Sequence, residues 1–534
     1  MARGSRAARR EPANPDSPEI SGAPIKMFKR ILIANRGEIA VRVIRACRDL
    51  GIESIAIYSD ADRAAAHVRA ADFAVGVGPA PASESYLKID NILAAAKRAG
   101  AEAIHPGYGF FSENAGFARA VIDAGLVFIG PTPDAIEKMG DKVAARTLMA
   151  AAGVPTVPGS PGTLESEEQV RAVASEIGFP IMLKAAAGGG GKGLRMVENE
   201  AGLASALRTV IGEAKSSFGD GRFYVEKYLN HPRHIEVQVM ADAHGNTVHL
   251  FERECSIQRR NQKVVEESPS PFVTAPMRQA MGEVAVRAAR AVNYLGAGTI
   301  EFLADADRNF YFLEMNTRIQ VEHAITELVT GVDLVRTQIE VAAGMRLRFS
   351  QDNLSQRGWA VECRIYAEDP ANGYAPAPGK IETLRFPEGP GVRVDAGVYA
   401  GAEVPIFYDP MIAKLATWGH DRAEAIDRMR RALAECVITG ELRTNLELHR
   451  WLMRQPRFLA GDYDIQFLER EFRPATEPAA SPTTKEDRLR LAAILAAAVA
   501  AGTTIKRADV ASQAGTGVRQ SAWKTAGRIA AVGG

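Results

Sequence analysis

Short apolar runs alternate with amphipathic stretches along the first 130 residues of the chain. Residues 37–51 place Ile39, Val43, Ile44, Cys47 and Leu50 on one side of a helix, which ends at Gly51. The same pattern predicts strands at 30–34, 54–58, 103–105 and 127–129, and helices at 37–51, 89–98 and 117–124. This alternation of strand and helix predicts a parallel sheet in a doubly wound α/β domain.

The pattern changes after about residue 150, where Pro155, Pro158 and Pro161 mark a linker. Further apolar or alternating runs predict strands at 181–184, 194–197, 223–229, 235–240, 248–252, 298–303 and 310–315. We therefore expect an α+β middle region with antiparallel strands, followed by a mixed region over about 359–472. Beyond Arg473 the chain is rich in Pro, Thr and Ala, with one helix candidate near 488–501.

Composition narrows the class of protein. The chain has 534 residues and a formal net charge of +1, which argues against a nucleic-acid-binding protein. Its four cysteines include no CxxC pair, so a reducing, cytoplasmic setting is expected. The longest apolar stretch, 491–501, is too short to span a bilayer. Residues 1–26 lack the apolar segment of a secretory signal, so we expect a disordered lead, although a weak organelle transit peptide is an alternative.

A run of glycines separates the strands expected at 181–184 and 194–197. Gly188, Gly189, Gly190 and Gly191 leave backbone N–H groups open to phosphate oxygens, and Lys184 and Lys192 flank them. The run matches neither a Walker A loop nor a dinucleotide-binding fingerprint. Two interpretations stay open: a flexible hairpin loop, or a lid that closes over a nucleoside triphosphate.

Two carboxylates face each other if residues 298–303 and 310–316 form a hairpin. With a two-residue turn at Asp307-Arg308, Glu301 lies opposite Glu314, and cross-strand partners point to the same face about 5 Å apart. Asn316 shares that face. Such oxygen ligands suit Mg²⁺ bound with substrate phosphates, and the alternative is a solvated polar face.

Several long motifs then occur in a fixed order, at residues 31–40, 105–114, 139–142, 184–193, 252–267 and 314–323, ending with 409–415. Over residues 27–472 they closely resemble biotin carboxylase, the ATP-grasp component of biotin-dependent carboxylases. The resemblance implies an α/β and α+β multidomain chain. Its expected parts are a Rossmann-like N-terminal domain (27–141), an ATP-grasp domain (142–345, with a glycine-rich lid at about 156–229), a mixed C-terminal domain (346–472) and a tail (473–534).

The resemblance also implies a reaction. In the family, ATP phosphorylates bicarbonate to carboxyphosphate, which then carboxylates a ureido nitrogen of biotin on a carrier. The expected ATP-binding residues are Lys142, Lys184, Gly189, Gly190, Gly191, Glu226, Lys227, Leu229, His234 and Gln258. Glu301 and Glu314, with Asn316, match the ligands of Mg²⁺ or Mn²⁺.

The remaining matched residues concern bicarbonate and biotin. Glu322 matches the general base, which must lie within hydrogen-bonding reach of the proton that it takes. Lys263 matches an active-site lysine, and Arg364 matches the arginine that stabilises the enolate of biotin. Arg318, Gln320 and Val321 match the bicarbonate pocket. Two positions depart from the common pattern: Asn261 stands where many members have His, and Ala324 replaces a Pro.

The sequence shows no biotin-accepting Ala-Met-Lys-Met motif, so the carrier protein and the carboxyltransferase are expected on separate chains, in a homodimer or larger complex. The final acceptor is expected to be acetyl-CoA or propionyl-CoA, as in fatty acid biosynthesis. Two alternatives remain: another ATP-grasp carboxylate–amine ligase, or an inactive nucleotide-binding regulatory subunit. An NAD dehydrogenase is excluded, because residues 35–38 do not form G-x-G-x-x-G.

Overall fold

The computed structural model describes residues 27–186, 193–219 and 221–473. The expected lead at 1–26, the glycines at 188–191 and the helix candidate at 488–501 lie outside these residues. Among the described residues, no helix combines the length and the apolar character needed to cross a membrane.

The first region is a parallel five-stranded sheet with the order β3-β2-β1-β4-β5, which confirms the predicted parallel sheet and adds β3, a strand that was not predicted. Its strands are β1 (Arg30–Ile33), β2 (Glu53–Ser59), β3 (Phe73–Gly78), β4 (Ala103–His105) and β5 (Val127–Phe128). The helices are α1 (Gly37–Asp49), α2 (Ala66–Ala70), α3 (Ile89–Ala99), α4 (Ala115–Asp123) and α5 (Pro133–Gly140). The apolar side of α1 packs into the core with Ile39, Val43, Ile44 and Cys47.

The second sheet has eight antiparallel strands in the order β13-β12-β9-β10-β11-β14-β20-β18. The strands are β9 (Arg233–Ala241), β10 (Thr247–Arg259), β11 (Gln262–Ser268), β12 (Gly296–Ala304), β13 (Phe310–Asn316), β14 (Trp359–Tyr366), β18 (Val392–Ala396) and β20 (Met411–Gly419). The sheet therefore continues without a break past the domain boundary expected at 345/346, because β11 pairs with β14.

Side-chain alternation gives this sheet one apolar face and one polar face. Val361, Cys363 and Ile365 of β14 pack toward α12 (Arg422–Glu435), while α9 (Ala275–Ala291) covers the apolar side of β9 and β12. Glu362 and Arg364 of β14 therefore point to the opposite face, toward α10 (His323–Thr330) and the loop before it. Every residue of β9 is buried, including its polar positions.

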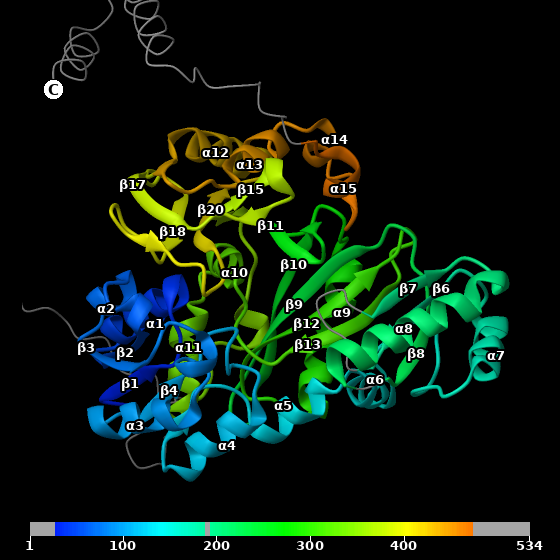
Figure 1. Ribbon diagram of the computed structural model, residues 1–534, viewed down its shortest axis with the longest axis horizontal. Helices are drawn as coiled ribbons and strands as arrows, with labels where there is room; N and C mark the ends of the chain where they lie inside the picture. Colours follow the sequence, from blue (N-terminus) through cyan, green and yellow to red (C-terminus); the bar gives the residue numbers. More distant parts are fainter. Residues whose placement is uncertain (1–26, 187–192, 220, 474–534) are drawn as a thin grey trace, which may run out of the picture. The chain divides into compact units, whose positions relative to one another are not determined.

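A third sheet, β7-β6-β8, is formed by β6 (Ile181–Ala185), β7 (Leu194–Val197) and β8 (Phe223–Lys227) (Figure 1). Two helices that flank it in the chain pack on it, α7 (Glu167–Ile177) and α8 (Leu203–Phe218). A capping box begins α7: the side chain of Ser166 accepts from the backbone N–H of Gln169, and the side chain of Gln169 accepts from the backbone N–H of Ser166. The remaining elements are α6 (Lys142–Ala151), α11 (Leu334–Ala342), α13 (Leu446–Leu452), α14 (Pro456–Leu459), α15 (Phe467–Glu471), β15 (Glu368–Asp369), β16 (Ala375–Pro376), β17 (Gly379–Arg385), β19 (Glu403–Val404) and β21 (Val437–Gly440).

The carboxylate hairpin forms with the predicted pairing but with a different turn. Glu301 pairs with Glu314 across β12 and β13, yet Ala304 pairs with Phe310. The turn is therefore one residue out of the predicted register, and a bulge next to Glu301 restores the pairing. The predicted two-residue turn at Asp307-Arg308 is wrong, whereas the predicted juxtaposition of the two carboxylates is confirmed.

Candidate functional site

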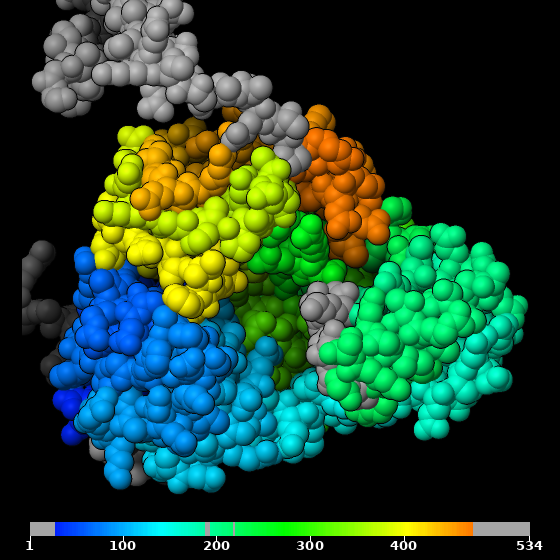
Figure 2. All heavy atoms as spheres, in the orientation of Figure 1, coloured from blue at the N-terminus to red at the C-terminus, as the bar shows by residue number. Residues whose placement is uncertain are grey.

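One cleft of about 850 Å³ collects the predicted site residues. Figure 2 shows the surface hollowed where blue, yellow and green parts of the chain meet. Every predicted residue outside the glycine loop lines the cleft: Lys142, Lys184, Glu226, Lys227, Leu229, His234, Gln258, Lys263, Glu301, Glu314, Asn316, Arg318, Gln320, Val321, Glu322 and Arg364. Gly189, Gly190 and Gly191 lie outside the described residues, so their predicted role stays a prediction.

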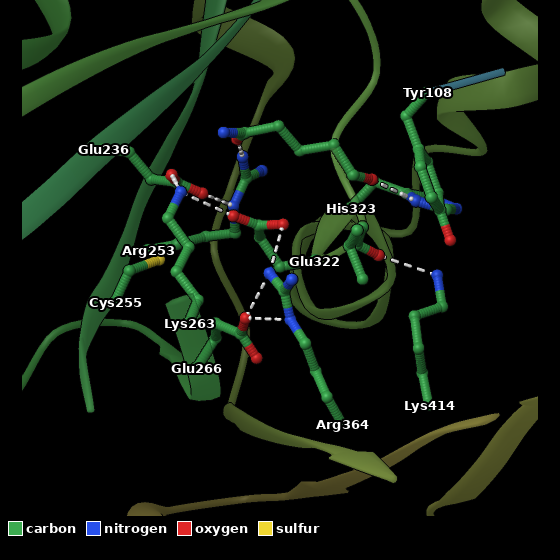
Figure 3. Close-up of polar contacts among 12 residues, drawn as sticks. Tyr108, Glu236, Arg253, Cys255, Lys263, Glu266, Glu322, His323, Arg364 and Lys414 are labelled. Atoms are coloured by element: carbon green, nitrogen blue, oxygen red, sulfur yellow. Dashed lines mark hydrogen bonds and ion pairs between the residues drawn. The ribbon is translucent and has the colours of Figure 1, made fainter. Parts of the chain in front are cut away.

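Lys263 is the centre of the polar face of the large sheet. Its Nζ donates to Glu236 Oε2 at 2.5 Å and to Glu322 Oε1 at 2.7 Å (Figure 3). It also donates to Glu301 Oε1 at 2.7 Å. Burial alone would lower the pKa of Lys263, but the three carboxylates raise it well above its usual value. The lysine is therefore a fixed cation that holds residues from three separate segments together.

Glu322 lies between two cations. Its Oε1 accepts from Lys263, and its Oε2 accepts from Arg364 Nη2 at 2.8 Å. Burial would raise the pKa of Glu322, yet Lys263 and Arg364 hold it well below its usual value. The carboxylate is thus ionised and fixed in position, as a proton acceptor must be.

Arg364 is held from behind by Glu266 of β11. Its Nε donates to Glu266 Oε1 at 2.6 Å, and Glu266 is fully buried. Burial raises the pKa of Glu266 to about 7, although Arg364 acts to lower it. Glu266 lies inside the motif at 252–267, but the sequence assigned it no role, because its contact with Arg364 depends on the pairing of β11 with β14.

Arg253 supports the floor of the cleft from below, and the sequence did not single it out. It is fully buried, and its Nε donates to Glu236 Oε1 at 2.5 Å. Its other nitrogens donate to Gln238 at 2.7 Å, Thr326 at 2.9 Å, Thr299 at 3.2 Å and Gln320 at 2.6 Å. A buried charge needs such partners to be tolerated. Arg253 stands between Glu252 and Glu254 in the sequence, so no local apolar pattern marked it as buried.

The expected ATP-binding residues lie between the small sheet and the large sheet. Lys184 Nζ of β6 is 2.5 Å from Glu226 Oε2 of β8, and Lys142 Nζ at the start of α6 is 3.6 Å from Glu314 Oε2. Lys227 differs from the other two lysines, because its Nζ donates to the carbonyls of Gly178 and Phe179. The walls here are apolar: Val157, Met182, Leu303, Leu313 and Ile465. The sequence missed Ile465, which is distant in the chain and joins the wall because its N–H donates to Pro232 O.

The residues predicted to hold a metal fit a divalent cation in part. Glu301 and Glu314 are cross-strand partners, and burial together with the Glu301 charge raises the pKa of Glu314. A cation between the two would relieve that repulsion. The amide nitrogen of Asn316, however, donates to Glu301, and its oxygen accepts from Arg318 at 2.9 Å. Two carboxylates with substrate phosphates suffice for Mg²⁺, which binds few protein ligands.

His234 completes this corner of the cleft. Its Nε2 lies 2.8 Å from Glu301 Oε2, and its Nδ1 lies 2.6 Å from the side-chain amide of Gln258. One nitrogen of His234 and one oxygen each of Glu236 and Glu301 lie close enough together to hold a metal ion. Lys263 already bonds both of these carboxylates, which disfavours that second metal position.

The segment from Thr317 to Glu322 forms the loop between β13 and α10. Arg318 Nε donates to Glu113 Oε2 at 2.9 Å, which links the loop to the first region of the chain. Gln320 donates to Glu301 at 2.8 Å and accepts from Arg253. Arg318, Gln320 and Val321 all line the cleft next to Glu322, so the expected bicarbonate pocket is assembled in one place.

The structure gives a physical account of Asn261. Arg260 and Asn261 form the two-residue turn between β10 and β11, with φ of +49° and +64°. Two positive φ values define a type I′ hairpin turn, in which Asn is favoured among residues with a side chain. The positive φ therefore favours Asn at position 261, a residue that also lines the cleft.

Ala324 is buried as the second residue of α10, directly after the loop. We expect Ala324→Pro to lower KM for bicarbonate modestly, because proline restricts His323 and stiffens the loop. The expected change is about two- to fivefold, the ratio that corresponds to about 0.4–1 kcal/mol. Steady-state kinetics with varied bicarbonate measures it, and an unchanged KM with unchanged loop order contradicts the idea.

Comparison with known families and proteins gives a consistent result. Three family models match: "Biotin carboxylase, N-terminal domain" at 27–136, "Carbamoyl-phosphate synthase L chain, ATP binding domain" at 141–350, and "Biotin carboxylase C-terminal domain" at 362–470. The biotin carboxylase of Nostoc sp. is 54% identical over 83% of this chain and 99% of its own length. The α chain of human mitochondrial propionyl-CoA carboxylase is 53% identical over 83% of this chain and 61% of its own.

Solved structures agree with this. The biotin carboxylase domain dimer of Hydrogenobacter thermophilus 2-oxoglutarate carboxylase, which holds MgADP, ADP and bicarbonate, has a TM-score of 0.79 and 49% identity. The match covers 83% of this chain and 98% of that domain. A Campylobacter jejuni biotin carboxylase complex has a TM-score of 0.80 and 47% identity, over 84% of this chain and 99% of that one.

Proposed function

We propose, from the premise that this chain belongs to the biotin carboxylase family, that it uses ATP and bicarbonate to carboxylate biotin on a separate carrier protein. The observation that carries the proposal is Glu322 held between Lys263 and Arg364 in the cleft. A carboxylate–amine ligase of the same ATP-binding fold has no need for a second cation at this position.

Glu322 would take the proton of bicarbonate as bicarbonate attacks the γ-phosphate of ATP. Its low pKa keeps it ionised before the substrate arrives. An anionic substrate beside Lys263 and Arg364 draws on the same two cations, so the proton affinity of Glu322 rises when bicarbonate is bound. Glu322 therefore becomes a stronger proton acceptor only when bicarbonate occupies its pocket.

Phosphoryl transfer needs positioning and neutralised charge more than covalent help. Lys142 and Lys184 supply cations beside the apolar wall where the base of ATP would pack. Glu301 and Glu314 would hold a divalent cation, which would supply positive charge against the phosphates of ATP. Arg364 lines the same cleft, and its guanidinium would stabilise an oxyanion of the ureido group of biotin.

The acceptor class is proposed from the relatives. They include propionyl-CoA carboxylase α chains and a component of the pyruvate carboxylase of Methanothermobacter thermautotrophicus, the latter 52% identical over 86% of this chain. We favour an acyl-CoA carboxylase, with the transferase on another chain. The Nostoc biotin carboxylase is matched over 99% of its length, so in that relative the same region stands as a protein of its own.

The test is ATP hydrolysis in the presence of Mg²⁺ and bicarbonate, with and without free biotin. We expect hydrolysis to require bicarbonate and to increase with biotin, because biotin consumes the activated intermediate. A second assay contains free amines in place of biotin, because an amine is the acceptor of a carboxylate–amine ligase. Turnover that biotin does not stimulate, or that amines stimulate instead, contradicts the proposed function.

A further inference from the structure

Lys414 of β20 is a deeply buried lysine to which the proposed reaction gives no role. It is 1% exposed, and its cross-strand partners are Arg364 on β14 and Asp395 on β18. Cross-strand partners point to the same face of a sheet, so Lys414 and Arg364 rise side by side toward α10. An ammonium group removed from water must find close partners, and those partners indicate what the residue does.

The closest partner is a backbone carbonyl of the bicarbonate loop. Lys414 Nζ donates to Val321 O at 2.7 Å, whereas Glu38 Oε1 and Asp395 Oδ2 lie at 3.5 and 3.7 Å. Both of these carboxylates have nearer partners, since Asp395 accepts from Arg393 at 2.8 Å and Glu38 accepts from Tyr108. Figure 3 shows Lys414 reaching the loop beside Arg364, on the side away from Lys263.

Glu362 leaves this arrangement undisturbed. It lies two residues before Arg364 on the same strand, is fully buried, and neither of its carboxyl oxygens has a hydrogen-bond partner among the described residues. Burial raises the pKa of Glu362 well above its usual value. No hydrogen bond joins Glu362 to Lys414, so the ammonium group keeps its short contact with Val321 O.

We propose that Lys414 is a positioning residue for bicarbonate, which acts with Arg364 to clamp two consecutive residues of the loop. Arg364 holds the side chain of Glu322, and Lys414 holds the peptide that joins Val321 to Glu322. The paired strands set the spacing of the two cations, so the general base and the bicarbonate pocket are fixed by one rigid element. This inference rests on the proposed function.

A purely structural role of Lys414 predicts a different effect of its substitution on the two KM values. Lys414 also bridges α1, through Glu38, to β18, through Asp395, and loss of that bridge would affect stability and both substrates alike. A clamp on the loop affects bicarbonate in particular, because the ATP-binding lysines lie on other elements. The ratio of the two KM values therefore separates the roles.

The experiment compares Lys414→Met, Lys414→Gln and Arg422→Met with the wild-type protein. Arg422 is the matched control, since it is a largely buried cation paired with Glu267 at 2.7 Å and does not line the cleft. We expect Lys414→Met to raise KM for bicarbonate at least tenfold and to change KM for ATP less than twofold. Lys414→Gln, which keeps a hydrogen-bond donor on a shorter side chain, is expected to raise the bicarbonate KM about threefold. Arg422→Met is expected to change neither KM.

Each outcome has one meaning. A bicarbonate KM within twofold of wild type in a folded Lys414 variant, or equal rises in both KM values, overturns the clamp. If Lys414→Met does not fold, Lys414→Gln decides by the same criteria. A wild-type protein without bicarbonate-dependent ATP hydrolysis contradicts the proposed function itself, whereas an active wild type with unchanged variants contradicts only the role of Lys414.

Discussion

Glu322→Gln is expected to lower bicarbonate-dependent ATP hydrolysis by about 10²–10⁴-fold, the usual contribution of a positioned general base. Glutamine nearly matches the shape of glutamate and can still accept from Lys263 or Arg364, but it cannot take a proton. The ATP-binding lysines, Lys142 and Lys184, contact other carboxylates and are unaffected. We therefore expect KM for ATP to stay within about twofold of wild type, as steady-state kinetics would show.

A matched control separates the loss of a base from the loss of a buried charge. Glu340 is also a buried carboxylate between two arginines, Arg336 at 2.8 Å and Arg348 at 2.7 Å, and it does not line the cleft. Glu340→Gln should leave turnover near that of wild type. Near-normal turnover of Glu322→Gln, with the control behaving as expected, rules out Glu322 as the base.

Local patterns were sufficient to predict most elements of the first region, but not β3, α2 or α5, and they also predicted the pairing of Glu301 with Glu314. Both depend on contacts between neighbouring segments: a strand beside the next strand, or two arms of one hairpin. The turn of that hairpin was predicted wrongly, because a bulge adds a residue that leaves no mark in the apolar pattern. The helices α6, α7 and α9 were also not predicted.

The supporting residues could not be predicted in this way. Glu266 meets Arg364 because β11 pairs with β14, and these strands are about 100 residues apart in the chain. Likewise, Lys414 meets Val321 only after β20 has joined the same sheet. The sequence motifs identified the residues that contact substrates in the family. Which charged residues hold those side chains in place depends on the register between distant strands. The alternation in β9 was visible, but only the structure shows that its polar face is buried and carries Glu236.

Lys263→Met is expected to have the largest combined effect on stability and activity. Three buried carboxylates share this one ammonium group, and each has a further cationic or imidazole partner: Arg253 for Glu236, His234 for Glu301 and Arg364 for Glu322. Removing one partner of a buried ion pair typically costs about 3–5 kcal/mol, because a charge stays behind without compensation. We expect a lower melting temperature and bicarbonate-dependent turnover reduced more than about 10²-fold.

The charge and the shape of Lys263 can be tested separately. Lys263→Arg keeps a cation in the cluster but replaces the compact ammonium group by a planar fork, which cannot reach three carboxylates from the same point. It should therefore recover most of the lost melting temperature and little of the turnover. If Lys263→Met instead kept both its melting temperature and its turnover, the carboxylates would have to be neutral in the folded protein, which contradicts the ionised Glu301 and Glu322 on which the proposed mechanism depends. Thermal unfolding and ATP hydrolysis, measured on the same preparations, distinguish these outcomes.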